Sequence, residues 1–391
     1  MPIQRLKDFI KLESKSSALL LGAVFFAIFL ANSPWRSFYE NLIEYPLHFS
    51  GGPFEAATSL KLIVNDGLMT IFFLLISLEV KRGFLVGELN SIKKAALPLI
   101  ASLGGILSAA MVYLLIHLGL GGATSIKGWA IPTATDIAFS SAILLLLGRA
   151  VPRSLRLLLT TLAIIDDLLA IFIIAIFYSV GFQIFYLLLG IFCFLGLFLL
   201  NRFRLLGLYG QIGLSILLWF CILKSNVSPP LAGVLIGLTV PLGDKKREGY
   251  SPLQNLEAVL HPWVSFGILP LFVFVNGGLN LLQTNFAMFY HPLTLGIIAG
   301  LFLGKQGGVF AACWFSTKAK LTHLPDGLSW QQIYGMSVLT GIGFTMNLFI
   351  GFLAFPNDLD SLNMVKLGIF TGSFLSAVVG FFILKRTLKR K

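Results

Sequence analysis

Four charged residues interrupt the apolar segments of this sequence. Asp136, the adjacent pair Asp166 and Asp167, and Lys305 each lie near the middle of an apolar run, whereas most other acids lie between runs or at their ends. A charge in the middle of a lipid bilayer costs about 2.5–3.5 kcal/mol even on the more lenient insertion scale. An ion pair that holds helices together would explain one of these acids, but not three against one base. The surplus of carboxylates therefore indicates a pathway for a cation or for protons.

The adjacent aspartates suggest a mechanism. Neighbouring side chains on an α-helix point about 100° apart, so Asp166 can face an ion path while Asp167 meets a partner such as Lys305, or the reverse. Carboxylate oxygen is the ligand that a small hard cation prefers. Like charges close together in a low dielectric favour protonation, and a nearby cation opposes it. Competition between protons and a metal cation for the same carboxylates would by itself produce exchange.

Two of the apolar runs contain weak points for a helix. Pro132 lies in the run 131–136, where it removes a backbone donor and clashes with the preceding turn. The run 339–347 contains Gly341 and Gly343. A mild kink or close packing at glycine would explain either one alone. The two runs lie in the middle helix of a group of three, the third to fifth and the tenth to twelfth, as expected of an inverted repeat.

If both helices unwind and cross, helix ends of like sign face each other at the crossing. Asp136 is placed to offset two positive N-terminal ends, and Lys305 to offset two negative C-terminal ends. We favour this charge-compensating role for Asp136 over direct contact with the ion, which remains the alternative. Thr135 could lend a hydroxyl or a backbone oxygen to the ion path.

Composition supports a membrane protein. The chain has 391 residues, of which 57% are hydrophobic and 12% charged, with a mean hydropathy of +0.88, whereas soluble domains carry about 25% charged residues. The net charge of +12 could indicate a nucleic-acid partner, but loop charges that orient membrane spans explain it better.

The three cysteines lie in apolar runs without paired spacing, so we expect no disulfide, resident metal or cofactor. No GxxxxGK[ST] loop is present, which excludes a nucleotide-driven pump.

The apolar runs predict an all-α membrane protein with twelve transmembrane helices in one polytopic domain, residues 1–391. The first run is interpreted as a retained span rather than a signal peptide, preceded by a short helix at the membrane interface. Most Lys and Arg residues fall on one side when the spans alternate, which predicts that both termini are cytoplasmic. The expected spans are Ser17–Ala31, Leu62–Val80, Ala95–Leu118, Trp129–Leu147, Leu157–Val180, Phe182–Leu200, Leu205–Leu223, Leu231–Leu242, Val259–Val275, Leu293–Phe315, Ile333–Phe355 and Val365–Leu384. The eighth is short, so we expect it to extend into its flanking loops or to tilt.

Several sequence motifs resemble the NhaA family of bacterial sodium/proton antiporters. They are NDGLMTIFFLLISLEVKR (65–82), AIPTATDIAFS (130–140), LAIIDDLLAI (162–171), LEAVLHPWVSFGILPLF (256–272) and LTGIGFTMNLFI (339–350). The resemblance covers nearly the whole chain. It implies twelve helices, inverted repeats of helices 3–5 and 10–12, and two crossed, interrupted helices, 4 and 11.

The resemblance also implies a function. The protein would sit in the bacterial inner membrane and expel Na⁺ or Li⁺ in exchange for a larger number of entering protons, with activation at alkaline pH. Asp166 and Asp167 would carry the ion and the protons. Lys305 would pair with Asp167 or take part in proton exchange, and Asp136 with Thr135 would lie at the crossing.

Further positions match the family at the two membrane surfaces. Four residues match cytoplasmic positions tied to pH activation: Glu79, Arg82, Glu257 and His261. Asp66 matches an acid near the external side. Three residues, Gly83, Ser228 and Ala258, replace a Glu and two His found in some relatives, so the pH midpoint stays open. His261, beside a proline and a tryptophan, could instead be a packed interfacial residue.

Two other functions use similar residues. A sodium-coupled solute symporter of similar fold would need a roomy polar cavity, whereas the polarity expected here in mid-membrane is almost all carboxylate. An intramembrane aspartyl protease would need a facing pair such as Asp136 and Asp166, but the chain has no GxGD motif, so we expect a transporter rather than an enzyme.

A hairpin in the loop Pro46–Glu55 could support a homodimer. The sequence leaves open the Na⁺/Li⁺ selectivity, the exchange ratio and the oligomeric state.

Overall fold

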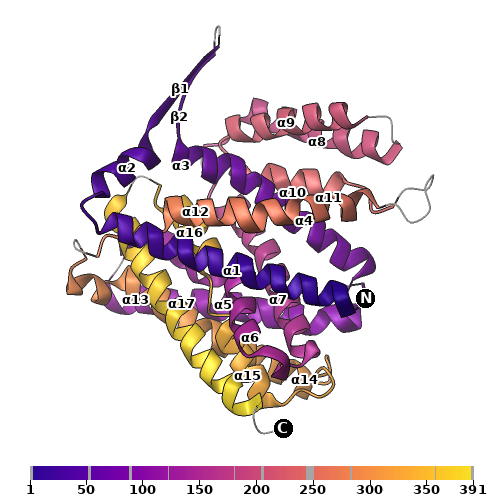
Figure 1. Cartoon of the computed structure of the whole chain (residues 1–391), viewed down its shortest axis with the longest axis vertical. Coiled ribbons are helices and arrows are strands. Elements are labelled where there is room, and N and C mark those ends of the chain that lie inside the picture. The colour runs from indigo at the N-terminus through magenta and orange to yellow at the C-terminus, as the bar shows by residue number, and fades with distance from the viewer. Residues whose placement is uncertain are drawn as a thin grey trace. The chain divides into compact units, whose positions relative to one another are not determined.

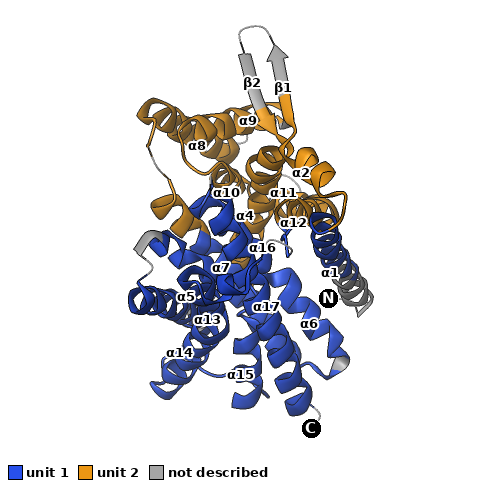
Figure 2. Ribbon diagram, turned by 90° about the vertical axis from the view of Figure 1, so that its left-hand side faces the viewer, with its two compact units in different colours: residues 1–32, 88–170, 277–391 blue, residues 33–87, 171–276 orange. Residues whose placement is uncertain are grey.

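The computed structural model describes residues 3–51, 54–87, 90–121, 123–179, 181–203, 207–243, 251–281, 284–356 and 358–388. The chain divides into two compact units, shown in different colours in Figure 2. Unit 1 consists of Met1–Asn32, Glu88–Ala170 and Gly277–Lys391, and unit 2 of Ser33–Gly87 and Ile171–Asn276. The expected mid-membrane residues Asp136, Asp166 and Lys305 therefore belong to one unit.

The regular secondary structure of unit 1 is all helical among its described residues (Figure 1). Long apolar segments favour helices because a helix satisfies its backbone hydrogen bonds within one segment, which lipid cannot do for it. The elements are α1 (Ile3–Ala31), α5 (Ile92–Leu120), the 3₁₀ segment η2 (Ala123–Thr133), α6 (Ile137–Leu146), η3 (Gly148–Ala150), α7 (Arg153–Phe177), η5 (Phe286–Tyr290), α13 (Pro292–Ala299), the π-helical segment η6 (Gly300–Lys305), α14 (Gln306–Lys318), α15 (Trp330–Leu339), α16 (Phe344–Ala354) and α17 (Leu359–Leu388). The boundary between the units falls within α7, after Ala170.

Two spans in unit 1 consist of bent pairs of shorter helices. The segment 125–133 and α6 meet at an angle of 44°, and α15 and α16 meet at 43°. The first bend follows Pro132, and the second lies at the stretch 340–343 with its two glycines. Both bends coincide with the weak points predicted from the sequence. The crossing of the two spans and the inverted repeat stay predictions.

Small residues allow α5 to pack closely against η6 and α14. A Cβ atom added at Gly104 would lie 2.5 Å from the Ala312 Cβ and 2.9 Å from the Gly308 carbonyl oxygen. One added at Gly304 would lie 2.7 Å from the Ala109 Cα. Such contacts are typical of helix pairs in membranes, where close backbone approach replaces the hydrophobic driving force. This packing fixes the helix that carries Lys305 against α5.

Unit 2 contains a β-hairpin in addition to helices (Figure 1). Strands β1 (Pro46–Gly51) and β2 (Phe54–Ser59) are antiparallel, with Pro46 opposite Ser59. The hairpin expected in the loop Pro46–Glu55 is present and extends four residues beyond Glu55, while the rest of the regular structure in the described residues is helical, as predicted. The helices of unit 2 are α2 (Arg36–Glu44), α3 (Leu60–Leu62), the π-helical η1 (Ile63–Leu68), α4 (Met69–Val86), α8 (Ile184–Phe203), α9 (Leu208–Lys224), α10 (Pro230–Thr239), α11 (Pro252–Trp263), the π-helical η4 (Val264–Ile268) and α12 (Leu269–Asn276).

The number of spans remains lower than the twelve predicted. By length and composition, seven helices among the described residues could cross a membrane, or up to ten when each bent pair counts as one span. Two shorter apolar helices, Tyr209–Lys224 and Pro230–Thr239, occupy the positions of the seventh and eighth predicted spans. The helix α10 starts at Pro230 and ends three residues before Leu242, so of the two alternatives for the eighth span it does not extend at its C-terminal end, and a tilt stays a prediction. Twelve spans therefore stay a prediction.

Candidate ion-binding site

Asp166 lies in the middle of α7 and is completely buried. Its Oδ1 accepts a hydrogen bond from the Ser102 hydroxyl of α5. Its Oδ2 lies 2.5 Å from the Thr135 Oγ1 and 2.7 Å from the Lys305 Nζ. A buried carboxylate is tolerated only when hydrogen bonds and an opposite charge replace its lost hydration. Asp166 meets this condition, because hydroxyl groups lie at both of its oxygens and the Lys305 ammonium at Oδ2.

Lys305 supplies the opposite charge and is itself completely buried. Besides the ion pair with Asp166, its Nζ donates to the Thr133 carbonyl at the end of η2. Gly105 of α5 makes room for the side chain, because a Cβ at that position would lie 3.4 Å from the Lys305 Cδ and Cε and 2.7 Å from Val309. The ammonium thus joins α7, η6 and the first interrupted span at one point.

Asp136 occupies the break of the first interrupted span, where it is the N-cap of α6. Its Oδ1 accepts from the Phe139 backbone N–H at 3.1 Å. Its Oδ2 accepts from the Thr345 backbone N–H at 2.8 Å and from the Thr345 hydroxyl at 2.5 Å. Thr345 belongs to the first turn of α16. One buried carboxylate therefore contacts the positive N-terminal ends of two helices.

The two interrupted spans also contact each other at backbone carbonyl groups of the second span. The Asp136 N–H donates to the Ile342 carbonyl at 2.7 Å, and the Thr135 Oγ1 lies 2.9 Å from the Thr340 carbonyl oxygen. These contacts satisfy backbone groups that the breaks release from helical hydrogen bonding. Because a hydroxyl has one proton, Thr135 can donate fully to only one of its two neighbours, the Thr340 carbonyl or Asp166.

The structure thus gathers most of the predicted site residues. Asp166 contacts both Lys305 and Thr135, and Asp136 is the next residue along the chain from Thr135. Asp167 is 3% exposed and follows Asp166 on α7. Lys305 forms an ion pair with Asp166, while the family resemblance implies that Lys305 pairs with Asp167 or takes part in proton exchange, which stays a prediction.

Sequence reasoning missed three of the residues that contact these charges. Ser102 donates to Asp166, Thr345 donates to Asp136, and the Thr133 carbonyl accepts from Lys305. The only sequence signal for Thr133 and Thr345 is their place beside the predicted breaks. Ser102 has no signal, because a single serine in an apolar helix is common and satisfies itself on its own backbone.

The gathered groups have the chemistry of a site for a small cation. Asp136, Asp166, Asp167 and Lys305 are all buried, the Lys305 ammonium contacts Asp166, and hydroxyl and carbonyl oxygens lie beside these two residues. Oxygen atoms of these kinds are the ligands that hard cations take. No group of three or more His, Cys, Asp or Glu residues in the described part of the chain is arranged to hold a metal ion.

The residues expected to respond to pH lie in unit 2. The Arg82 Nε of α4 is 2.8 Å from Glu257 Oε2 and 3.1 Å from Oε1, both on α11, with the arginine side chain 40% and the glutamate 16% exposed. Glu79 precedes Arg82 by about one turn, and His261 follows Glu257 by about one turn. The structure therefore joins Arg82 to Glu257 in an ion pair and places Glu79 and His261 on the same two helices.

The remaining predicted acid is part of a π-helical segment. Asp66 lies in η1, and its carbonyl accepts from the Thr70 hydroxyl at 2.6 Å and from the Trp219 Nε1 at 3.1 Å. Among the three departures from the family, Gly83 lies in α4 and Ala258 in α11, while Ser228 is buried just before α10.

Comparison with known proteins identifies the family. The family model described as "Na+/H+ antiporter 1" matches residues 7–384. The chain belongs to the Na⁺/H⁺ antiporter 1 family. It is 45% identical to "Na(+)/H(+) antiporter NhaA 1" of Syntrophotalea carbinolica over 393 aligned positions, which cover 100% of this chain and 98% of the relative. It is 44% identical to "Na(+)/H(+) antiporter NhaA" of Rhodospirillum rubrum, with 98% of both chains covered.

A third relative extends the comparison. The protein named "Na(+)/H(+) antiporter NhaA" from Pseudomonas putida is 45% identical over 95% of each chain. The resemblance to the NhaA family expected from the motifs is confirmed. With its long apolar helices, this member of the Na⁺/H⁺ antiporter 1 family is a multi-pass membrane protein.

Proposed function

We propose that this protein is a secondary antiporter that expels Na⁺, or Li⁺, in exchange for protons that enter through Asp166 and Asp167. The observation that supports this most directly is the ion pair between Asp166 and Lys305, with the second carboxylate of Asp167 next along α7 and all three residues buried. Relatives 44–45% identical over nearly their whole length carry the name of sodium/proton antiporters.

Competition at one carboxylate can drive the exchange. Asp166 Oδ2 has the Lys305 ammonium at 2.7 Å and the Thr135 hydroxyl at 2.5 Å. A sodium ion that binds there displaces the ammonium and takes oxygen ligands from Asp166 and Asp167, with the Thr135 hydroxyl beside them. A proton that binds the carboxylate removes the charge that holds the sodium ion. Thr135 can then donate to the Thr340 carbonyl, 2.9 Å away, while its oxygen accepts a hydrogen bond from the protonated Asp166 carboxyl.

The same two carboxylates imply electrogenic exchange. If both give up a proton when one sodium ion binds, each cycle brings one more positive charge in than it takes out. Moving one elementary charge through the membrane potential is worth about 2.3 kcal/mol per 100 mV. An inside-negative potential therefore favours proton entry and sodium exit, which lets the protein maintain cytoplasmic pH and a low sodium concentration.

Asp136 serves in this proposal as charge compensation. Its carboxylate accepts from N–H groups of α6 and α16, so it neutralises two helix N-termini where the interrupted spans cross. Lys305 has the complementary role at the carbonyl end of η2. The crossing would belong to an inverted repeat of helices 3–5 and 10–12.

The remaining assignments follow from the family. Glu79, Arg82, Glu257 and His261 would respond to cytoplasmic pH through the ion pair of Arg82 with Glu257, and Asp66 would lie near the external side. The protein would be in the bacterial inner membrane, surrounded by lipid, with both termini cytoplasmic. The β1–β2 hairpin is a candidate for contacts in a homodimer.

Exchange in everted vesicles tests the proposal. Addition of Na⁺ or Li⁺ to energised vesicles should restore the fluorescence of a pH-sensitive dye for the unaltered protein, and should fail to do so for Asp166→Asn and Asp167→Asn. Asp326→Asn, which removes an exposed carboxylate outside the site, is the matched control and should keep full exchange. Undiminished exchange in both site variants would contradict the assignment of Asp166 and Asp167 as the residues that carry the ion and the protons. Exchange that requires an organic solute would favour a symporter.

A further inference from the structure

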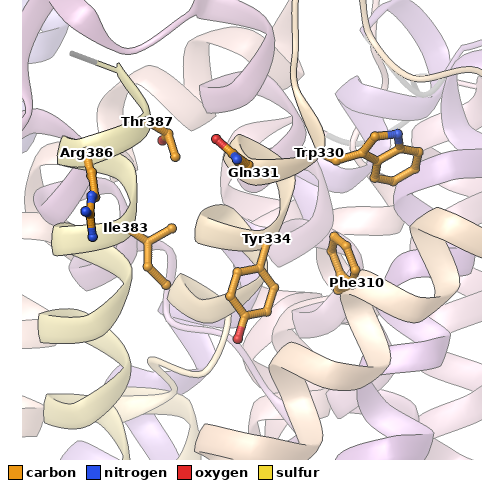
Figure 3. A pocket seen from close by; sticks show the side chains of 7 residues that line it. All are labelled: Phe310, Trp330, Gln331, Tyr334, Ile383, Arg386 and Thr387. Carbon is orange, nitrogen blue, oxygen red and sulfur yellow. The ribbon is translucent and has the colours of Figure 1, made fainter. Parts of the chain in front are cut away.

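A groove opens between α15 and α17 of unit 1, away from the buried carboxylates. Its volume is about 490 Å³, and its walls come from α17 on one side and from α15 and α14 on the other (Figure 3). Figure 3 shows Ile383 and Arg386 on the α17 side and Gln331 and Tyr334 on the α15 side. The proposed exchange does not use any of these residues, so the groove calls for a separate explanation.

Aromatic rings form one wall of the groove. The ring of Phe310 packs edge-to-face on Trp330, with centroids 6.0 Å apart, and on Tyr334, with centroids 5.4 Å apart. Tyr334 is 40% exposed. Tryptophan and tyrosine are enriched where a membrane protein meets the headgroup region, because their rings are apolar and their N–H and O–H groups are polar. This wall therefore suits a ligand that is itself amphipathic.

The groove lies at the ends of its helices rather than at their middles. Trp330 and Gln331 open the first turn of α15, and Arg386 lies in the last turn of α17. α17 has 30 residues, about 45 Å at 1.5 Å per residue, whereas the hydrocarbon core of a bilayer is about 30 Å thick. The end of α17 thus reaches the headgroup region when its apolar middle spans the bilayer.

The charge at this end is positive. Arg386 lines the groove and is exposed, and no carboxylate among the described residues forms an ion pair with it. The sequence continues with Lys389, Arg390 and Lys391. The Thr387 hydroxyl donates to the Leu384 carbonyl, which leaves the Arg386 guanidinium and the Gln331 amide as donors for a ligand. A guanidinium matches the oxygens of a phosphate with two parallel hydrogen bonds.

We propose that this groove binds an anionic phospholipid of the cytoplasmic leaflet. Arg386 and Gln331 hold the phosphodiester, and an acyl chain lies along Ile383 and the ring of Tyr334. The lipid thereby bridges α15 and α17, two helices that already pack closely at Gly335, where an added Cβ would lie 2.8 Å from Leu384. The proposal uses the cytoplasmic orientation of the C-terminus but not the exchange reaction, so either can fail without the other.

The fluorescence of Trp330 tests the proposal in the full-length protein. The protein is reconstituted with phospholipids that carry brominated acyl chains, which quench tryptophan on contact, and the signal of Trp330 is obtained by subtraction of the Trp330→Phe variant. Half-maximal quenching by brominated phosphatidylglycerol should occur at about fivefold lower mole fraction than by brominated phosphatidylcholine, the ratio expected for one basic side chain at a membrane surface.

Two variants separate the site from general surface charge. Arg386→Gln should abolish the fivefold preference. Lys385→Gln is the matched control, because Lys385 is the neighbouring basic residue, lies over the Phe381 ring at 5.4 Å and does not line the groove, and it should keep the preference. Thr387→Phe, which fills the groove and keeps every charge, should lower the quenching by both lipids and serves if Arg386→Gln does not fold.

Several outcomes would overturn the proposal. Equal quenching of Trp330 by the two lipids in the unaltered protein would do so, as would equal losses of preference in Arg386→Gln and Lys385→Gln. A response of Trp330 to inorganic phosphate without any preference among lipids would assign the groove to a soluble anion instead. Unchanged quenching in Thr387→Phe would place the lipid elsewhere.

Discussion

Replacement of Lys305 by methionine removes the positive charge of the buried ion pair with Asp166 and changes the length of the side chain only slightly. In the structure the Lys305 Nζ lies 2.7 Å from Asp166 Oδ2, and both side chains are completely buried. Loss of one partner from a buried ion pair leaves an uncompensated charge and costs about 3–5 kcal/mol of stability. Lys305→Met should therefore lower the free energy of unfolding by about that amount.

A second substitution distinguishes loss of charge balance from loss of packing. In the Lys305→Met background, Asp166→Asn removes the charge that has been left without its partner, so the double variant should regain most of the lost stability. The expected coupling energy in this double-mutant cycle is at least about 2 kcal/mol, within the range found for residues in contact. Both single variants should have lost exchange, and the double variant should not recover it.

Thermal unfolding of the purified protein in detergent measures these differences. Lys318→Met is the control, because Lys318 is exposed at the end of α14 and its ammonium lies 4.6 Å from the centre of the Trp314 ring, a contact worth about 0.5–1 kcal/mol. Stability of Lys305→Met equal to that of the control would refute the charge-balance argument. So would a double variant no more stable than Lys305→Met alone.

Two further substitutions test individual hydrogen bonds. Ser102→Ala removes a hydrogen-bond donor to Asp166. A hydrogen bond to a charged group contributes about 1.5–3 kcal/mol, so the sodium concentration for half-maximal exchange should rise more than tenfold. An unchanged sodium concentration would show that Ser102 is dispensable. Ser361→Ala concerns the start of α17, where hydrogen bonds from the Ser361 side chain and backbone N–H lower the pKa of Asp358. Because that pKa is depressed by folding, the variant should lose less than about 1 kcal/mol at pH values above about 4. The difference in melting temperature should disappear as the pH falls through the lowered pKa, and a difference that persists in acid would contradict this origin.

The charged residues of the site could be predicted because burial of charge in an apolar run is costly and therefore conspicuous. Asp136, Asp166, Asp167 and Lys305 were identified on that ground alone, and all four are buried in the structure. The breaks at Pro132 and at the paired glycines were visible for a similar reason, since these residues disfavour a continuous helix.

The contacts between these residues could not be predicted. Two adjacent aspartates point in different directions, but the sequence does not fix the rotation of α7 about its axis, so it does not tell whether Asp166 or Asp167 faces Lys305. Ser102 and Thr345 raise the same difficulty. Hydroxyl side chains are common in apolar helices, and only the three-dimensional packing shows that these two donate to buried carboxylates.

Secondary structure was predicted least well where segments are short. The hairpin at residues 46–59 was expected, but its C-terminal end was placed four residues too early, at Glu55 instead of Ser59. The length of α10 was misjudged because an apolar run continues to Leu242, whereas the helix ends at Thr239 and the chain becomes extended at Val240. Hydrophobicity predicts that a segment is buried or in lipid, but not where its backbone leaves the helix.

Release of protons on sodium binding is the most direct test of the central claim that both compete for Asp166 and Asp167. A pH indicator in weakly buffered detergent solution reports the protons released when sodium is added to the purified protein at alkaline pH, while radioactive sodium reports the ions bound. We expect more than one proton per bound sodium ion for the unaltered protein and no release for the Asp166→Asn/Asp167→Asn variant. Sodium binding without proton release in the unaltered protein, or equal release in the variant, would contradict the account.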